Sequence, residues 1–219
     1  MNLFQNKKPV IAIDGTASSG KGTLAKKLSK FTGFDHLDSG ILYRIYAYEY
    51  IKKSNDFSNI ENITIDSSVF NNFDKINDKN LRSEEVSKAA SLIAKSTYVR
   101  ESLIYIQREI ADHPKGGKGS VIDGRDITSV ITPKAEIKFY VDANIEVRAK
   151  RRQDQLKMPN EKFQEILMEM RQRDENDKKR ENSPLVKTND SFFIDTSLIS
   201  EDDVFKIAIH EVKKKIDFI

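Results

Sequence analysis

The residues between Gly15 and Thr23 combine small side chains, a lysine and hydroxyl groups in a spacing that suits phosphate binding. They read Gly15-Thr16-Ala17-Ser18-Ser19-Gly20-Lys21-Gly22-Thr23 and contain the pattern G-x-x-x-x-G-K. Small residues let successive backbone N–H groups surround phosphate oxygens, and the lysine adds a full positive charge. We predict that all of these residues bind the phosphates of a nucleoside triphosphate, ATP, and that Lys21 is catalytic. The alternative is a glycine-rich turn with a chance lysine.

Arginines from separated segments could neutralise a second anion. Arg44 follows the turn Asp38-Ser39-Gly40, Arg125 follows an apolar run, and Arg173 and Arg180 lie in a strongly charged stretch. Phosphoryl transfer between two anions depends on charge neutralisation and positioning, and a guanidinium can bind a phosphate through two parallel hydrogen bonds. For any single arginine the alternative is a solvated surface charge. That alternative is weaker for Arg44 and Arg125, because both follow predicted strand ends.

Carboxylates near the same strand ends could hold a metal ion. Asp123 ends an apolar run, where it could hold Mg²⁺ directly or through water. The alternative is a capping or turn role, and Asp14 has the same two interpretations. The chain has no cysteine, which excludes zinc–thiolate sites and thiol catalysis, and its three histidines (His36, His113, His210) are scattered.

Alternating strands and helices must position these residues. Short apolar runs rich in β-branched residues predict buried strands over 10–13, 34–37, 120–123, 137–141 and 192–194. Helical patterns occur over about 20–31, after Gly40, twice within 83–112 with a break near 96–97, and over 144–156, 161–180 and 201–216. This order predicts an α/β fold with a doubly wound parallel sheet of about five strands. Ligands of such sheets bind outside the carboxyl ends of the strands, where Asp14, Asp38 and Asp123 fall.

The composition narrows the classes of partner. The 219 residues carry 37 basic and 34 acidic side chains, a net charge of +3. A dedicated nucleic-acid binder would have a larger imbalance, so we expect no nucleic-acid partner. The N-terminal residues lack the apolar stretch of a signal peptide, and no apolar run approaches a membrane span. We expect a cytoplasmic monomer.

Four blocks of the sequence resemble the bacterial cytidylate kinase family. They are Gly15–Thr23, Leu37-Asp38-Ser39-Gly40-Ile41-Leu42-Tyr43-Arg44, Asp123-Gly124-Arg125-Asp126 and the stretch from Arg173 to Arg180. The resemblance runs in order from about residue 9 to the end of the chain. It implies the nucleoside monophosphate kinase fold, and it implies that ATP with Mg²⁺ phosphorylates CMP or dCMP. It also implies a core of about 9–51, 83–150 and 188–219, an acceptor-binding excursion of about 52–82 and a lid of about 153–187. We expect short strands in the excursion, which is shorter than in longer family members.

The same resemblance implies roles for individual residues. Lys21, Asp123, Arg125 and Arg173 would be catalytic, and Mg²⁺ would arrive with ATP and lie near Thr23 and Asp123 rather than in a protein cage. Arg44 and Arg125 would bind the acceptor phosphate, Asp126 would accept from the cytosine N4 amino group, and Asp177 would hold the ribose hydroxyls. The full acceptor set would be Asp38, Ser39, Tyr43, Arg44, Ser91, Arg100, Arg125, Asp126, Arg173, Asp177 and Arg180. Ser91 and Arg100 would donate to the base; for them the alternative is the polar face of a helix, and for Asp177 an exposed helix carboxylate.

Two other functions remain open. Another small-molecule kinase with the same core would act on AMP, UMP, shikimate or dephospho-coenzyme A. A regulatory or nucleic-acid-binding ATPase would use nucleotide binding at the loop as a switch. Such a protein is expected to have a surplus of basic residues, whereas the charges here are nearly balanced. Residues 38–44 and the pair Arg125-Asp126 favour an acceptor that carries both a phosphate and a cytosine amino group.

Overall fold

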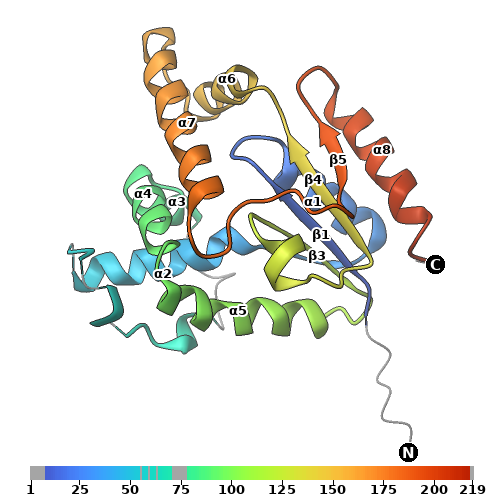
Figure 1. Ribbon diagram of the computed structural model, residues 1–219, viewed down its shortest axis with the longest axis horizontal. Helices are drawn as coiled ribbons and strands as arrows, with labels where there is room; N and C mark the ends of the chain where they lie inside the picture. Colours follow the sequence, from blue (N-terminus) through green and yellow to red (C-terminus); the bar gives the residue numbers. More distant parts are fainter. Residues whose placement is uncertain (1–7, 55, 59, 63, 71–77, 218–219) are drawn as a thin grey trace, which may run out of the picture. The chain divides into compact units, whose positions relative to one another are not determined.

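The computed structural model describes residues 8–217 except 55, 59, 63 and 71–77. The chain divides into two compact units (Figure 1). The first unit comprises the chain up to Leu37 together with the chain from Arg108 onward, and the second comprises Asp38–Gln107. Each unit is described in turn.

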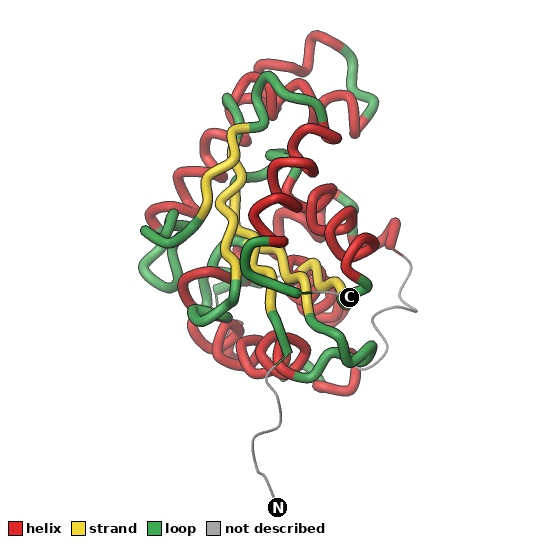
Figure 2. Tube along the Cα trace, turned by 90° about the vertical axis from the view of Figure 1, so that its right-hand side faces the viewer, coloured by secondary structure: helices red, strands yellow, loops and turns green. Residues whose placement is uncertain are grey.

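A five-stranded sheet with the order β2-β3-β1-β4-β5 forms the centre of the first unit. The central strand β1 pairs in parallel with β3 and β4, and β4 pairs in parallel with β5. The predicted doubly wound parallel sheet is therefore confirmed, and helices alternate with strands along the chain (Figure 2). The strands are β1 Val10–Gly15, β2 Asp35–Asp38, β3 Ser120–Gly124, β4 Ile137–Asp142 and β5 Phe192–Asp195.

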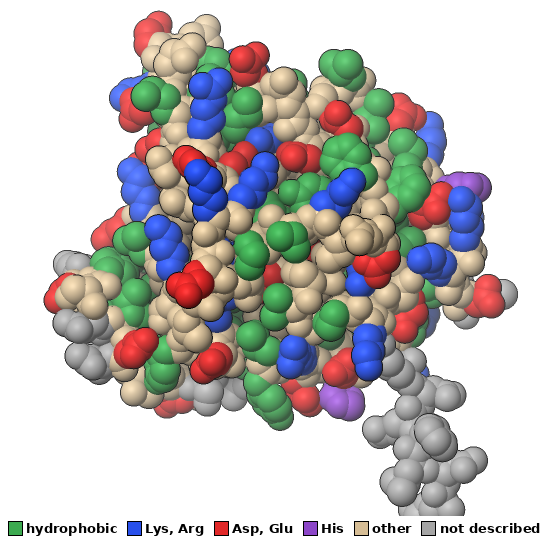
Figure 3. Space-filling view, viewed as in Figure 1, with side chains coloured by type: hydrophobic (Ala, Val, Ile, Leu, Met, Phe, Trp, Pro, Cys, Tyr) green, Lys and Arg blue, Asp and Glu red, His purple; other side chains and the backbone are tan. Residues whose placement is uncertain are grey.

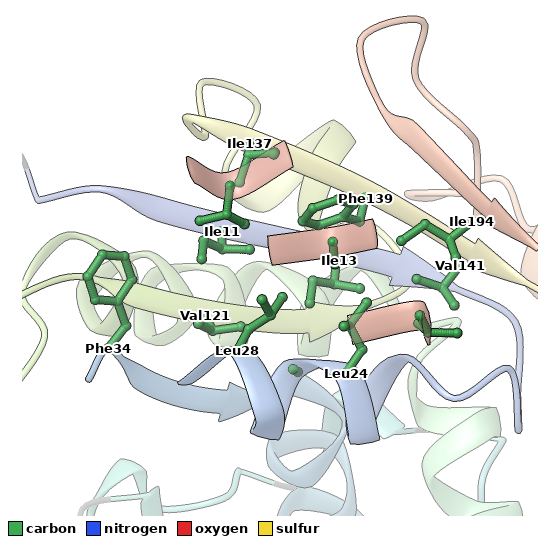
Figure 4. Close-up of a cluster of buried hydrophobic side chains, with 14 of the residues drawn as sticks. Ile11, Ile13, Leu24, Leu28, Phe34, Val121, Ile137, Phe139, Val141 and Ile194 are labelled. Atoms are coloured by element: carbon green, nitrogen blue, oxygen red, sulfur yellow. The ribbon is translucent and has the colours of Figure 1, made fainter. Parts of the chain in front are cut away.

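Two helices, α1 (Lys21–Thr32) and α8 (Glu201–Lys213), pack against the sheet of the first unit. Alternate strand residues such as Ile11 and Ile13 point into this layer, which Figure 4 shows with Leu24 and Leu28 of α1. In α8 the apolar residues recur at helical spacing, and Ser200 caps its first turn by accepting from the Asp203 N–H. The core fixes the direction of β1, so it also fixes where the loop after β1 emerges.

A pair of helices, α6 (Ile145–Leu156) and α7 (Phe163–Lys179), follows β4 in the first unit. Asn144 caps α6, and Lys157 ends it in the left-handed conformation before the short 3₁₀ turn η5 (Asn160–Lys162). The two helices share a separate apolar cluster, which consists of Ala17, Ala149, Ile166, Leu167 and Met170. Ala17 belongs to the loop after β1, so this cluster joins that loop to the helix pair.

The second unit consists of helices. Asp38 caps α2 (Ser39–Lys53), Ser83 caps α4 (Glu84–Ile93), and α2 packs against α4. The remaining elements are the 3₁₀ turns η1 (Ile60–Asn62) and η2 (Ser67–Phe70), the short helix α3 (Asp78–Leu81) and α5 (Thr97–Asp112), whose last residues lie in the first unit.

The expectation of short strands in the segment 52–82 is wrong for its described residues, which form short helical turns and no strand. Tyr50 organises the start of this segment, because its hydroxyl donates to the Asp56 carbonyl at 2.6 Å and its ring stacks on Phe57. Residues 55, 59, 63 and 71–77 of the predicted excursion lie outside the described residues. Among the helices that the structure describes, none is long and apolar enough to cross a membrane.

Candidate active site

The loop Gly15–Gly20 turns sharply between β1 and α1, as its glycines require. A Cβ atom on Gly15 would lie 2.0 Å from the carbonyl oxygen of Val141, so no other residue fits that position. Gly20 has a φ of 89°, and Ser18 also adopts the left-handed region with a φ of 57°. Gly20 begins α1 without a side-chain cap, whereas α2, α4, α6 and α8 each have one. The first N–H groups of α1 are thus not used by a cap and suit an anion.

Side chains of β4, of α6 and of the residue after β5 hold this loop through its polar groups. The Thr16 hydroxyl donates to Oδ1 of Asp142 at 2.5 Å, and Nη1 of Arg148 donates to the Ala17 carbonyl at 3.2 Å. The Thr196 hydroxyl donates to the Ser19 carbonyl at 2.8 Å, and Lys21 Nζ lies 3.3 Å from the Thr16 carbonyl. These contacts fix the shape of the loop. They involve its carbonyl groups and the Thr16 hydroxyl, and none of them involves a backbone N–H group of the loop.

Asp123 lies at the end of β3 beside the start of α1. Its Oδ1 is 2.8 Å from Nε2 of His36 on β2, and its Oδ2 is 3.7 Å from the position that a Cβ on Gly22 would take. The carboxylate is almost fully buried. One oxygen is therefore held by a histidine while the other faces the phosphate-binding loop. His36 is a residue that the sequence did not indicate, because its partner lies far along the chain on β3.

Asp14 has a structural role that settles the choice left open by its sequence context. Its carboxylate accepts hydrogen bonds from the Ile127 N–H at 2.9 Å, the Thr128 N–H at 2.8 Å and the Thr128 hydroxyl at 2.7 Å. These donors begin a single π-helical turn, η4 (Ile127–Ile131), which the sequence did not predict. Full burial raises the pKa of Asp14 from 3.8 to about 6, although the three hydrogen bonds oppose the shift. Asp14 thus anchors the segment that follows Arg125 and Asp126.

Four of the predicted acceptor residues meet in the first unit, between the end of β3 and α7. Nε of Arg125 donates to Oδ2 of Asp177 at 2.8 Å, and Nη2 of Arg180 lies 3.8 Å from Oδ1 of Asp126. Burial alone would raise the pKa of Asp177, but the charges of Arg125 and Arg173 and the hydrogen bond from Arg125 lower it below its ordinary value. Asp177 is therefore not an exposed helix carboxylate.

The sequence did not indicate a role for Arg148 on α6 or for Asp174 on α7, although Asp174 lies within the block from Arg173 to Arg180. Both are buried, and Nη2 of Arg148 lies 2.5 Å from Oδ2 of Asp174. In the sequence they belong to a run of mixed charges, whose commonest meaning is a solvated helix surface. Nothing in that pattern separates them from exposed pairs of the same helices such as Lys179 with Glu175.

Arg173, a further residue of the predicted acceptor set, lies on α7 in the first unit, and the remaining ones lie in the second unit. Nη1 of Arg44 donates to the Leu81 carbonyl at 2.9 Å and to the Ser87 hydroxyl at 2.6 Å. Arg100 is buried rather than on a polar helix face; its Nη1 donates to the Ala94 carbonyl at 3.0 Å, and its guanidinium lies 5.6 Å from the Tyr43 ring centre.

Three other predicted residues of the second unit have less distinctive surroundings. Asp38 accepts from the Gly40 N–H at 3.1 Å and lies 3.9 Å from Arg82, so its capping role is clear. Ser39 is buried at the start of α2, and Ser91 is half-buried on α4.

The visible surface in Figure 3 mixes basic and acidic side chains rather than gathering the basic ones into a stripe. This mixture agrees with the near-balanced charge of the sequence. On that face the pattern gives no support to the nucleic-acid-binding alternative.

A phosphate-binding loop on the central strand of a parallel sheet, with arginines paired to carboxylates at the neighbouring strand end, defines the P-loop kinase class. Solved structures share this fold at low sequence identity. An uncharacterized protein from Eubacterium ventriosum matches with a TM-score of 0.55 at 15% identity, covering 94% of this chain and 99% of the other. A gluconokinase from Sinorhizobium meliloti matches with a TM-score of 0.50 at 12% identity, and the match covers 96% of this chain and 94% of the gluconokinase chain.

Sequence relatives are more specific than these folds. The family model for cytidylate kinase matches residues 11–214. The cytidylate kinase of Paramagnetospirillum magneticum is 38% identical over 94% of this chain and 98% of its own length. The cytidylate kinase of Bartonella bacilliformis is 40% identical over 91% of this chain and 92% of its own length. That of Mycoplasma capricolum is 33% identical over 94% of this chain and 96% of its own length. The chain belongs to the cytidylate kinase family and is an ATP-dependent nucleoside monophosphate kinase.

Proposed function

We propose that this chain transfers the γ-phosphoryl group of ATP to CMP or dCMP and does so with the residues described above. An oxygen of the acceptor phosphate forms the new bond to the γ-phosphorus. The bond from that phosphorus to the β–γ bridging oxygen breaks, which gives CDP or dCDP and ADP. The observation that carries the proposal is the pairing of Arg125 with Asp177, and of Arg180 with the buried Asp126, at the end of β3 in the same unit as the P-loop.

The residues from Gly15 to Thr23 bind ATP in this proposal. Their N–H groups and the start of α1 surround the phosphates, and Lys21 places its charge on the phosphoryl group that moves. Mg²⁺ accompanies ATP, and the Thr23 hydroxyl and Asp123 would hold it. The fit rests on Asp123, whose Oδ2 faces Gly22 while His36 engages Oδ1. When bound, the ion would neutralise charge on the phosphate oxygens.

The acceptor is recognised through its phosphate, its ribose and its base. Arg44 and Arg125 neutralise the acceptor phosphate, Arg173 is catalytic, and Asp177 accepts from the ribose hydroxyls. Asp126 accepts from the N4 amino group of cytosine, and its burial makes an unmatched partner unfavourable. The other residues of the acceptor set are Asp38, Ser39, Tyr43, Ser91, Arg100 and Arg180.

The division of the chain into a core, an acceptor-binding excursion and a lid also belongs to this proposal. The lid is the region of about 153–187, which contains all of α7, and the excursion is the region of about 52–82. Closure of a lid would exclude water from the reacting phosphates and limit hydrolysis of ATP. The substrates are small nucleotides, which suits a monomer acting in the cytoplasm.

ADP formation from ATP and Mg²⁺ with AMP, GMP, CMP, UMP, dCMP or no acceptor tests the proposal. We expect strong turnover with CMP and dCMP, weak turnover with UMP and almost none without acceptor. Asp126→Ala should narrow the CMP:UMP ratio of kcat/KM by about tenfold, because a buried partner for N4 is lost. Turnover with no acceptor, or only with a purine monophosphate, would contradict the assignment to cytidine nucleotides.

A further inference from the structure

Arg148 is a permanently charged side chain at a nearly inaccessible position, with 4% of the residue exposed. It donates from Nε to the Ala143 carbonyl at 2.8 Å, from Nη1 to the Ala17 carbonyl at 3.2 Å and from Nη2 to Asp174 at 2.5 Å. Its Nε also lies 3.6 Å from Oδ1 of Asp142, the acceptor of the Thr16 hydroxyl. A buried charge is tolerated only when it is paired and hydrogen-bonded, so this geometry is tightly constrained. One guanidinium thus joins the P-loop to α7.

The same junction is closely packed by apolar side chains. Ala17 of the P-loop contacts a cluster that contains Ala149 of α6 and Ile166, Leu167 and Met170 of α7. Protein interiors are packed densely and transmit small displacements rather than absorbing them. A change in the position of Ala17 must therefore be accompanied by a change in the α6–α7 pair.

The next turn of α7 carries residues proposed to bind the acceptor. Asp177 follows Asp174 by one turn and accepts from Arg125 at 2.8 Å, and Arg180 lies 3.8 Å from Asp126. Residues three apart lie on the same side of a helix. The helix α7 is therefore joined to the P-loop by the Asp174–Arg148 pair and to Arg125 by Asp177, and Arg180, the first residue after the helix, lies beside Asp126.

We propose that Arg148 is a positioning residue that couples ATP binding at the P-loop to acceptor binding at α7 and the end of β3. The inference rests on the proposed function. Phosphates that fix the Ala17 region fix Arg148, and Arg148 then fixes Asp174 and the following turn of α7. Coupling of binding free energies is reciprocal, so CMP must strengthen ATP binding by the same factor.

Isothermal titration of CMP into the full chain, with and without Mg²⁺ and the non-hydrolysable analogue AMP-PNP, measures this coupling. We expect AMP-PNP to tighten CMP binding to the wild-type protein by at least about fivefold, the lower end of common coupling energies. Arg148→Lys keeps a positive charge but presents a single ammonium instead of a planar fork. In this variant AMP-PNP should tighten CMP binding by less than about twofold, because the two binding sites would then be nearly independent.

Two further variants separate coupling from folding. Arg148→Met combined with Asp174→Leu removes both charges and keeps the volume, a replacement that buried ion pairs often tolerate. This double variant should keep the far-ultraviolet circular dichroism spectrum of the wild-type protein and lose the coupling; its melting temperature should fall, because the Ala17 and Ala143 carbonyls lose a donor. Arg152→Lys is the matched control on the same helix, because its described hydrogen bond goes to Gln155 within α6. Arg152→Lys should retain both the melting temperature and the coupling of the wild-type protein.

The outcomes are distinct. Absence of coupling in the wild-type protein, or full coupling in both Arg148 variants, would overturn the inference even if CMP is phosphorylated normally. A lower melting temperature with unchanged coupling would make Arg148 a purely structural residue and would also overturn it. Failure of CMP to bind in any condition would instead contradict the proposed function.

Discussion

The P-loop and Arg44 are both proposed to bind phosphate, but the protein holds them in different ways. The P-loop is fixed by hydrogen bonds to its carbonyls and to the Thr16 hydroxyl, which leave its N–H groups for a ligand. In Arg44, by contrast, the guanidinium itself donates to the protein, from Nη1 to the Leu81 carbonyl and to the Ser87 hydroxyl. The P-loop is thus preorganised for an anion, whereas Nη1 of Arg44 is already bonded to protein, so a phosphate must be bound by its other N–H groups or in exchange for these partners.

The largest expected effect concerns the preorganised region. Lys21→Ala should lower kcat at least about 100-fold, because a charge aimed at the transferred group is lost. The far-ultraviolet circular dichroism spectrum should be unchanged, because Lys21 is only half-buried and its side chain is not part of the apolar core. Unchanged turnover would contradict the assignment of Gly15–Thr23 as the ATP-binding loop.

Asp14 provides a test of how firmly the segment after Arg125 is anchored. The pKa of Asp14 is about 6 in the folded protein, against 3.8 for the ordinary group. Between these values the folded state binds a proton that the unfolded state does not, so this group stabilises the fold as pH falls from about 7 to 4. Over that range the free energy of unfolding of the wild-type protein should rise by about 3 kcal/mol relative to Asp14→Asn. Urea unfolding at several pH values measures the difference, and parallel curves for the two proteins would contradict the raised pKa of Asp14.

Arg44→Ala should affect the acceptor more than ATP. We expect the KM for CMP to rise at least about tenfold, because a charge-assisted hydrogen bond to phosphate is lost, with the KM for ATP within about twofold. Lys88→Ala is a matched control on α4, where Lys88 forms an exposed pair with Glu84. A rise in the KM for ATP instead would assign Arg44 to the other substrate.

The smallest expected effect is the sharpest test of the contrast between the two regions. If Arg44 leaves the Ser87 hydroxyl when CMP binds, Ser87→Ala should tighten CMP binding by up to about fivefold, the worth of a typical hydrogen bond. Titration of CMP into the variant measures this. Weaker binding in Ser87→Ala would mean that Ser87 positions Arg44 for the phosphate, and the proposed exchange would be wrong.

Local patterns predicted the P-loop and the elements around it because the evidence lies in consecutive residues. Strand β1, the loop and α1 follow from an apolar run, small residues and a helical period, and the break between α4 and α5 was also found. His36, Arg148 and Asp174 could not be found, because their partners are brought together only by the sheet and by the α6–α7 pair. The π-helical turn after Asp126 depends on Asp14, which lies far away in the chain. The short strands expected within 52–82 failed because Asn, Asp and Ser also suit short helical turns.

The destination of the γ-phosphate tests the central claim most directly. ATP labelled in the γ position is incubated with Mg²⁺, CMP and the protein, and the labelled products are separated. The account predicts that the label moves into CDP in amounts equal to the ADP formed, with little labelled inorganic phosphate. Label released as inorganic phosphate at the same rate with and without CMP would contradict it.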